Sequence, residues 1–453
     1  MFWLELVVVL AAIFVGARLG GIGLGVMGGL GLAVLTFVFH LQPTSPPIDV
    51  MLMIAAVVTA AGVLQGAGGL DYLVGLAERI LRSKPDAITF LGPLVTYTFT
   101  LFAGTGHVAY SVLPVIAEVA RETGVRPERP LSISVIASQQ AITASPISAA
   151  TVALLGMLGT GAAGAAFHIE LIDILKVCIP STLVGVLLAA FVSNRMGRDL
   201  AEDADYQHRV DIGAAPAPGR HEPALTDGPV QASPVSTRLA KVAVVIFLLA
   251  AVSVVLFGSF PALRPEWKTA QGVAKLGMPH VIEMVMLTAA GLMLLLCRVN
   301  VSRVVNGSVF IAGVQAVIAI FGIAWMGDTF FQGNMAFLSG NIKGMVTSAP
   351  WLFAFALFAL SVLLYSQAAT VRALMPLGIS LGIPAPALMA MFPAVNGYFF
   401  IPNYPTIVAA INFDRTGTTR IGKYVLNHSF MVPGLISTAG AIATGFLLVR
   451  FLY

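Results

Sequence analysis

Long apolar runs, separated by short polar stretches, follow one another along almost the whole chain. Several are close to the roughly 20 residues that an α-helix needs to cross a bilayer, which predicts an all-α polytopic membrane protein. The first run begins near Met1, and we interpret it as a helix rather than as a cleaved signal. The runs lie at 3–17, 20–39, 51–68, 87–118, 131–156, 171–194, 240–259, 281–297, 306–326, 350–382, 385–411 and 430–450.

The longest polar stretch divides these runs into two equal sets. It has the Pro, Ala, Gly and mixed charge that are typical of a flexible linker. We therefore predict a first repeat at 1–197, a cytoplasmic linker at 198–239 and a second repeat at 240–453. Basic residues concentrate in the loops of one side, and the positive-inside rule then places both termini in the periplasm.

Two runs are unusual because each holds a polar turn near its middle. The centre of 87–118 reads FAGTGH, and basic loops flank both of its ends. This favours a re-entrant hairpin that enters and leaves the membrane on one side; one long tilted helix or two short spanning helices is the alternative. Run 350–382 turns near SQAA, between flanks that hold a single Lys, which favours a hairpin that opens on the opposite face.

The two halves also match locally. Pro114 lies nine residues after Thr105, and Pro376 lies nine residues after Gln367. Each half then has a broken helix, at ASPIS within 131–156 and at IPNYPT within 385–411. Two inverted repeats, each with five spanning helices and one re-entrant hairpin, describe a secondary transporter of alternating access.

Composition and charge exclude several other classes of protein. The chain of 453 residues is 58% hydrophobic and 10% charged, with a mean hydropathy of +0.91. A net charge of +4 is better explained by basic loops between helices than by nucleic-acid binding. Cys178 and Cys297 form no CxxC motif, so we expect no zinc site, structural disulfide or other cofactor. The Gly-rich stretch 16–31 indicates close helix packing rather than a dinucleotide site.

The hairpin tips and helix breaks are the predicted substrate-binding site. Helix ends exposed at mid-membrane carry unsatisfied N–H groups and a partial positive charge, which suit an anion. Glycines let a ligand approach the backbone, and short polar side chains add hydrogen-bonding groups. The predicted residues are Gly104, Thr105, Gly106, His107, Ser145, Pro146, Ser148, Ser366, Gln367, Thr370, Arg372, Asn403, Tyr404 and Thr406.

Arg372 gives this site its charge. Its guanidinium matches a carboxylate with two parallel hydrogen bonds, and an unpaired Arg at the bilayer centre costs at least about 2.5–3.5 kcal/mol. The alternative is that Arg372 reaches an interface or pairs with Asp328, the only acid between Glu283 and Asp414. Asp328 itself either binds a coupling cation or is solvated near a helix end. His107 either donates to substrate, carries a proton or is a buried imidazole.

Many segments, in order from the N-terminus to about Pro433, resemble the anaerobic C4-dicarboxylate transporter (Dcu) family. FHLQP, GTGHV and FDRTGTT…NHSF are most similar to B-type members, whereas SQAATVRALMP is closer to the A-type. The matching segments are GARLGGIGLG, FVFHLQPTSPPIDVML, GGLDYL, GTGHVAYSVLPVIAE, RPERP, ASPISAA, IPSTL, GIAWMGDTFF, SQAAT, NYPTIVAAI and FDRTGTTRIGKYVLNHSF.

The resemblance implies a function and partners. It implies exchange of fumarate, malate or aspartate for succinate across a bacterial inner membrane in anaerobic respiration, by an elevator-type carrier of the ion-transporter group. It also implies a homodimer and a membrane sensor as a further partner. A symporter that couples C4-dicarboxylates or a related organic anion to H⁺ or Na⁺ is the alternative. A Ser/His hydrolase is disfavoured because the serines lie at separate breaks and no acid orients His107.

Overall fold

The chain folds into helices that follow the apolar runs closely. The computed structural model describes residues 1–19, 22–46, 48–159, 169–216, 237–269, 272–334, 336–337, 349, 351–364, 366–402, 404–422 and 426–453. In the first half the elements are α1 (Phe2–Leu19), α2 (Gly23–Phe37), α3 (Ile48–Gly66), α4 (Gly69–Ser83), η1 (Pro85–Ala87), α5 (Ile88–Ala103), η2 (Gly106–Val108), α6 (Ala109–Glu122), α7 (Glu128–Ala144), α8 (Ala149–Gly159), α9 (Leu171–Ser193) and α10 (Ala204–Asp211).

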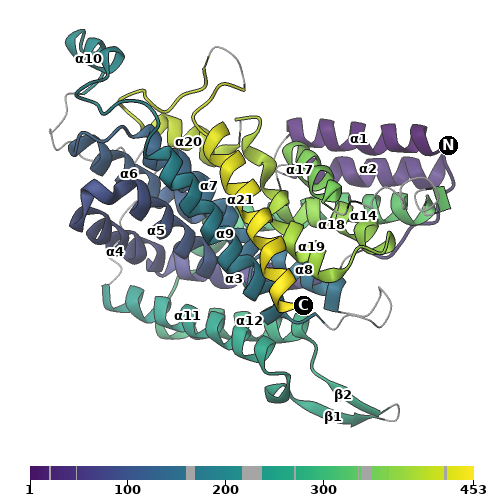
Figure 1. Cartoon of the computed structure of the whole chain (residues 1–453). Helices are drawn as coiled ribbons and strands as arrows, with labels where there is room; N and C mark the ends of the chain where they lie inside the picture. The colour runs from purple at the N-terminus through teal and green to yellow at the C-terminus, as the bar shows by residue number, and fades with distance from the viewer. Residues whose placement is uncertain are drawn as a thin grey trace.

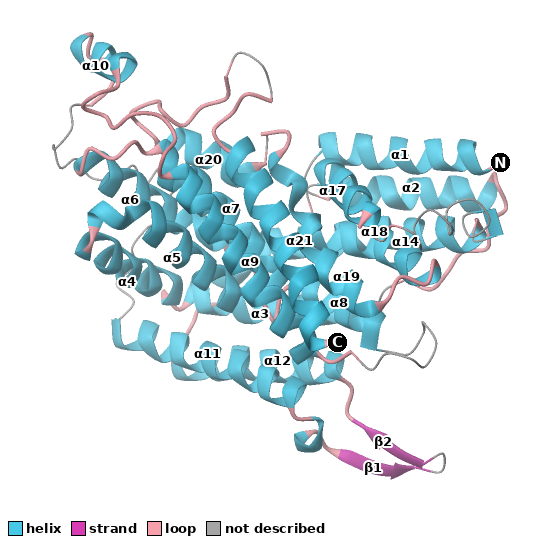
Figure 2. Ribbon diagram, in the orientation of Figure 1, coloured by secondary structure: helices cyan, strands magenta, loops and turns pink. Residues whose placement is uncertain are grey.

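The second half is also helical, apart from one antiparallel β-hairpin (Figure 2). Its elements are α11 (Thr237–Ser259), η3 (Pro261–Leu263), β1 (Glu266–Thr269), β2 (Gly272–Lys275), α12 (Met278–Leu296), α13 (Val301–Val305), α14 (Ser308–Gly333), α17 (Leu352–Leu364), α18 (Gln367–Ser380), α19 (Ala385–Met391), η4 (Phe392–Phe399), α20 (Pro405–Phe413) and α21 (Met431–Leu452).

The prediction of an all-α polytopic membrane protein is confirmed. In the part of the chain that the structure describes, six helices are long and apolar enough to cross a membrane, or up to seven if the bent pair α3–α4 forms one span. Large apolar side chains such as Phe37 and Leu295 remain 78% and 77% exposed, which suits contact with lipid. The inverted repeats and the domain boundaries stay predictions.

Helix α4 is an amphipathic element that the apolar runs do not include. It follows α3 after a bend of 71°, and Gly68 permits the bend because its φ of 73° is left-handed. One face of α4 buries Ala77 and Leu81. Since α4 packs against α6 and α11, it joins helices from both halves of the chain.

The contact between α2 and α14 confirms that the Gly-rich stretch serves close helix packing. A Cβ atom on Gly28 would lie 2.5 Å from the carbonyl carbon of Gly322, and one on Gly322 would overlap the carbonyl oxygen of Gly25. Only glycine permits backbones to approach so closely. Figure 1 shows α1, α2 and α14 side by side at one end of the molecule.

The first part of the predicted linker folds against the protein, and residues 217–236 lie outside the described residues. Asp203 begins α10 by accepting a hydrogen bond from the Tyr206 N–H at 3.0 Å, and its carboxylate also pairs with Arg126. Arg209 Nε donates to the Thr416 carbonyl at 3.1 Å. This segment therefore connects the α6–α7 loop to the loop that follows α20.

Candidate substrate-binding site

The first predicted hairpin turns where the sequence indicates, at its glycines. α5 ends at Ala103, and Gly104 follows in the left-handed region with a φ of 72°. A Cβ atom on Gly104 would lie 2.9 Å from Cγ1 of Ile147. The tip therefore rests on the ASPIS break of the first half. A cavity of about 90 Å³ adjoins Gly104 and Thr105, and otherwise it has mostly apolar walls.

The first helix break is held by its own serines. Ser148 Oγ donates to the Ile142 carbonyl at 2.5 Å and accepts from the Thr151 N–H at 3.1 Å. It thus satisfies a carbonyl at the end of α7 and an N–H at the start of α8. Ser145 and Pro146 are also buried. The sequence places these residues together correctly, but the Ser148 hydroxyl is already engaged in capping.

The second tip begins with a helix cap. Ser366 precedes α18, and its Oγ accepts a hydrogen bond from the Ala369 N–H at 3.2 Å. Thr370 Oγ1 donates back to the Ser366 carbonyl at 2.8 Å. The preference of Ser for this position explains why the helix starts here. The backbone places the side chain of Gln367, the first residue of α18, in the protein interior, where it is 6% exposed.

The two tips meet at Gln139, a residue of α7. Gln367 Nε2 donates one hydrogen bond to Gln139 Oε1 at 2.9 Å and a second to Asn396 Oδ1 at 3.1 Å. From the other side, Gly106 of the first tip lies so close that a Cβ atom there would overlap Gln139 Nε2. The structure therefore brings Gly106 and Gln367 to opposite sides of one buried amide.

Buried amides extend this contact into a network that sequence reasoning missed. Asn396 Nδ2 donates to Gln140 Oε1 at 3.1 Å, and Gln140 Nε2 donates to Thr438 Oγ1 at 3.0 Å. Leaving one such group unpaired when buried costs about 1–3 kcal/mol. The available signal was the pair Gln139–Gln140 inside an apolar run, since polar side chains within membrane segments are frequently functional.

Arg372 lies on α18 beside α14. Its side chain is 8% exposed, and the two helices are close because a Cβ atom on Gly327 would lie 3.6 Å from Ala373 Cα. Arg372 interacts electrostatically with Asp328, which is half-buried. Asp328 lies in the C-terminal part of α14, five residues before the helix ends at Gly333.

The second break lies against η4, α6 and α7. Tyr404 precedes α20, with its ring centroid 4.7 Å from that of Tyr398, and α20 packs against α6 and α7. Thr406 is buried, and its Oγ1 has no hydrogen-bond partner among the described residues. Tyr404 thus lies beside η4, the element that also carries Asn396 of the amide network. Asn403 and the side chain of His107 lie outside the described residues.

The similarity of the chain to known proteins covers its full length. A family described as anaerobic c4-dicarboxylate membrane transporters matches residues 1–453. The chain belongs to this family. The C4-dicarboxylate transporter DcuA of Wolinella succinogenes is 45% identical over 448 residues, 99% of either chain. The Dcu resemblance of the sequence is thereby confirmed, and the protein is a transporter and not an enzyme.

Relatives of both Dcu types match this transporter to a similar degree. The anaerobic C4-dicarboxylate transporter DcuB of Escherichia coli O157:H7 is 41% identical over 99% of this chain and 98% of its own. The C4-dicarboxylate transporter DcuA of Escherichia coli K12 is 42% identical over 100% of both. A B-type assignment therefore stays a prediction from the segments FHLQP, GTGHV and FDRTGTT…NHSF.

Solved structures of other transporters share the fold of this Dcu protein. The YdaH transporter of Alcanivorax borkumensis gives a TM-score of 0.56 at 16% identity, covering 95% of this chain and 98% of its own. MtrF of Neisseria gonorrhoeae, described among antimetabolite efflux pumps, gives a TM-score of 0.54 at 15% identity, covering 92% of this chain and 84% of its own. At such low identity the similarity shows the fold alone.

Proposed function

We propose that this transporter exchanges C4-dicarboxylates across the inner membrane by alternating access, taking up fumarate, malate or aspartate and releasing succinate. The supporting observation is that the two hairpin tips meet at Gln139 and Gln367. A ligand bound at this meeting point would contact both halves of the chain at once, as a transporter with a central site requires.

The groups around this point suit a substrate with two carboxylates. Amide N–H groups and the N-terminus of α18 offer neutral donors and a partial positive charge. Arg372 adds a full charge, and it lies five residues after Gln367 on α18, about 7.5 Å along the helix axis. We infer that one small dicarboxylate engages the N-terminus of α18 with one end and the guanidinium with the other, the long Arg372 side chain reaching back toward the start of the helix.

Exchange of one dianion for another, such as fumarate or malate for succinate, transfers no net charge, so it requires no coupling ion. The alternative is symport with H⁺ or Na⁺, because carbonyl groups at helix breaks can hold Na⁺ without any acidic side chain. As finer parts of the same proposal, the transporter acts as a homodimer and also contacts a membrane sensor. Chemical crosslinking of the protein in its native membrane would test both associations.

Counterflow in proteoliposomes tests the proposed exchange. Labelled fumarate is offered to vesicles that contain unlabelled succinate and to empty vesicles, without any ion gradient. We expect rapid uptake only into the loaded vesicles. Uptake into empty vesicles that needs an imposed H⁺ or Na⁺ gradient would contradict exchange and establish symport. Arg372→Ala should abolish the counterflow while the protein still elutes as a folded species, and unchanged affinity would remove Arg372 from the site.

A further inference from the structure

Among the described helices that pack extensively against the Arg372 helix, Asp328 is the only charged residue. Helices α8, α14, α17, α19 and η4 surround α18. Their described sequences contain one charged side chain, and it is Asp328 of α14. Among the described residues, Arg372 and Asp328 are thus opposite charges on neighbouring helices in an apolar part of the protein.

The backbones of α14 and α18 approach each other beside these two residues. Gly327 and Ala373 are the adjacent residues, and their close approach sets the separation of α14 and α18. Arg372 acts electrostatically on Asp328 across this contact. Asp328 is a half-buried carboxylate on the helix next to Arg372, the residue that we propose binds substrate. A carboxylate in this position repels a substrate carboxylate and attracts a substrate cation.

We propose that Asp328 is the subsite for the ammonium group of an amino dicarboxylate, with Arg372 holding the carboxylate on the same carbon atom. This inference rests on the proposed function and names one substrate class within it. An α-amino acid presents adjacent positive and negative groups, so it can bind between the two side chains. Its carboxylate accepts hydrogen bonds from Arg372, and its ammonium donates to Asp328.

Plain dicarboxylates bind the same site less favourably at this end. Succinate has no cation to offer Asp328, and malate presents a hydroxyl where aspartate presents an ammonium. Loss of one charge-assisted hydrogen bond lowers affinity by about 10- to 100-fold. Asp328 therefore sets the preference between amino dicarboxylates and plain ones, whereas the amide network around Gln367 serves both.

The test compares the full-length transporter with Asp328→Asn in the same proteoliposomes. Counterflow of labelled succinate is inhibited with unlabelled aspartate, malate and succinate. In the variant, we expect the half-inhibitory concentration of aspartate to rise about 10- to 100-fold relative to succinate, with malate behaving like succinate. Asp328→Glu should restore part of the preference. Glu266→Gln removes an exposed acid on β1 and should change nothing.

Several results would overturn the inference. If the ratio of the half-inhibitory concentrations of aspartate and succinate is unchanged, or if all three ligands lose affinity equally, Asp328 has a structural role only. If that ratio is unchanged but the counterflow rate no longer depends on pH, Asp328 is a proton site. A wild-type protein that exchanges succinate but ignores aspartate would remove the subsite and leave the proposed function standing. Absence of any wild-type exchange would instead remove the proposed function, and the subsite with it.

Discussion

Gly106 shows that the candidate site depends on the absence of a side chain. Its neighbour Gln139 cannot easily move aside, because the amide is hydrogen-bonded to Gln367. We expect Gly106→Ala to push Gln139 out of this contact and to slow counterflow about tenfold or more, as the loss of one or two buried hydrogen bonds implies. The measurement is the initial rate of fumarate uptake into succinate-loaded vesicles.

Gly75→Ala is the matched control for this substitution. Gly75 lies on α4, and no atom lies within 4 Å of the position its Cβ would take. The control should keep the wild-type rate or gain slightly in stability, because Ala favours a helix. Equal rates for the two variants would show that the amide contact does not matter for transport.

Single residues were the part of the site that the sequence predicted least completely. Glycines mark the first tip directly, and the polar segment SQAA within an apolar run marks the second, so the tips at Gly104 and Ser366 could be located from the local sequence. The pair Gln139–Gln140 was a polar mark in an apolar run, whereas Asn396 is one amide in its run. The hydrogen bond between Gln140 and Asn396 joins residues more than 250 positions apart, which no local pattern encodes.

At the scale of elements, the segment around α10 is the clearest difference from expectation. Its composition is that of a flexible linker, yet residues 198–216 contact two distant loops. Leu200 N donates to the Gly124 carbonyl at 3.0 Å, and Arg129 pairs with Asp199 at 2.6 Å. Such order arises from long-range ion pairs and hydrogen bonds. Helix propensity over a few residues cannot predict it, because short helices are unstable alone.

Asp203→Ala should loosen this segment. The substitution removes the N-cap of α10 and the pairing with Arg126, and loss of a cap alone costs about 0.5–2 kcal/mol. Hydrogen exchange followed by mass spectrometry should show faster exchange in residues 204–211. Glu202→Ala changes a neighbouring exposed acid and should leave the exchange as it is. Equal exchange in both variants would mean that Asp203 does not anchor α10.

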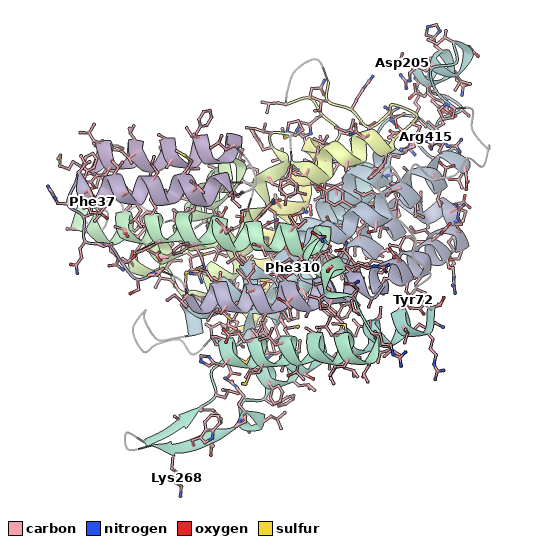
Figure 3. All side chains as sticks on the ribbon, turned by 180° about the vertical axis from the view of Figure 1, so that it is seen from behind. Phe37, Tyr72, Asp205, Lys268, Phe310 and Arg415 are labelled. Carbon is pink, nitrogen blue, oxygen red and sulfur yellow. The ribbon has the colours of Figure 1, made fainter. Side chains whose placement is uncertain are left out.

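For the whole molecule, the order of apolar runs predicted the helices well, because a bilayer demands long apolar segments. The orientation in the membrane can be tested on two opposite ends of the protein. Figure 3 labels Lys268 on the β-hairpin at one end and Asp205 on α10 at the other. Both residues are exposed, while the native Cys178 and Cys297 are buried.

The predicted orientation, with both termini in the periplasm, makes the β-hairpin periplasmic and α10 cytoplasmic. A membrane-impermeant maleimide should label Lys268→Cys in intact cells and should label Asp205→Cys only after permeabilisation. The wild-type protein should remain unlabelled, because its own thiols are covered. The opposite pattern would reverse the orientation, and labelling of both variants in intact cells would contradict the arrangement of the helices between them.

The contact of Gly25 and Gly28 with Gly322 limits how the two halves of the chain can rearrange. Backbones that interlock without side chains between them have no compressible layer, so they cannot translate past each other unless they first separate. At this contact there are no flexible side chains that could change rotamer to let one helix slide past the other. Any large sliding step during a transport cycle must therefore occur along a surface other than the α2–α14 contact, and these two helices, one from either half, travel or stay still together.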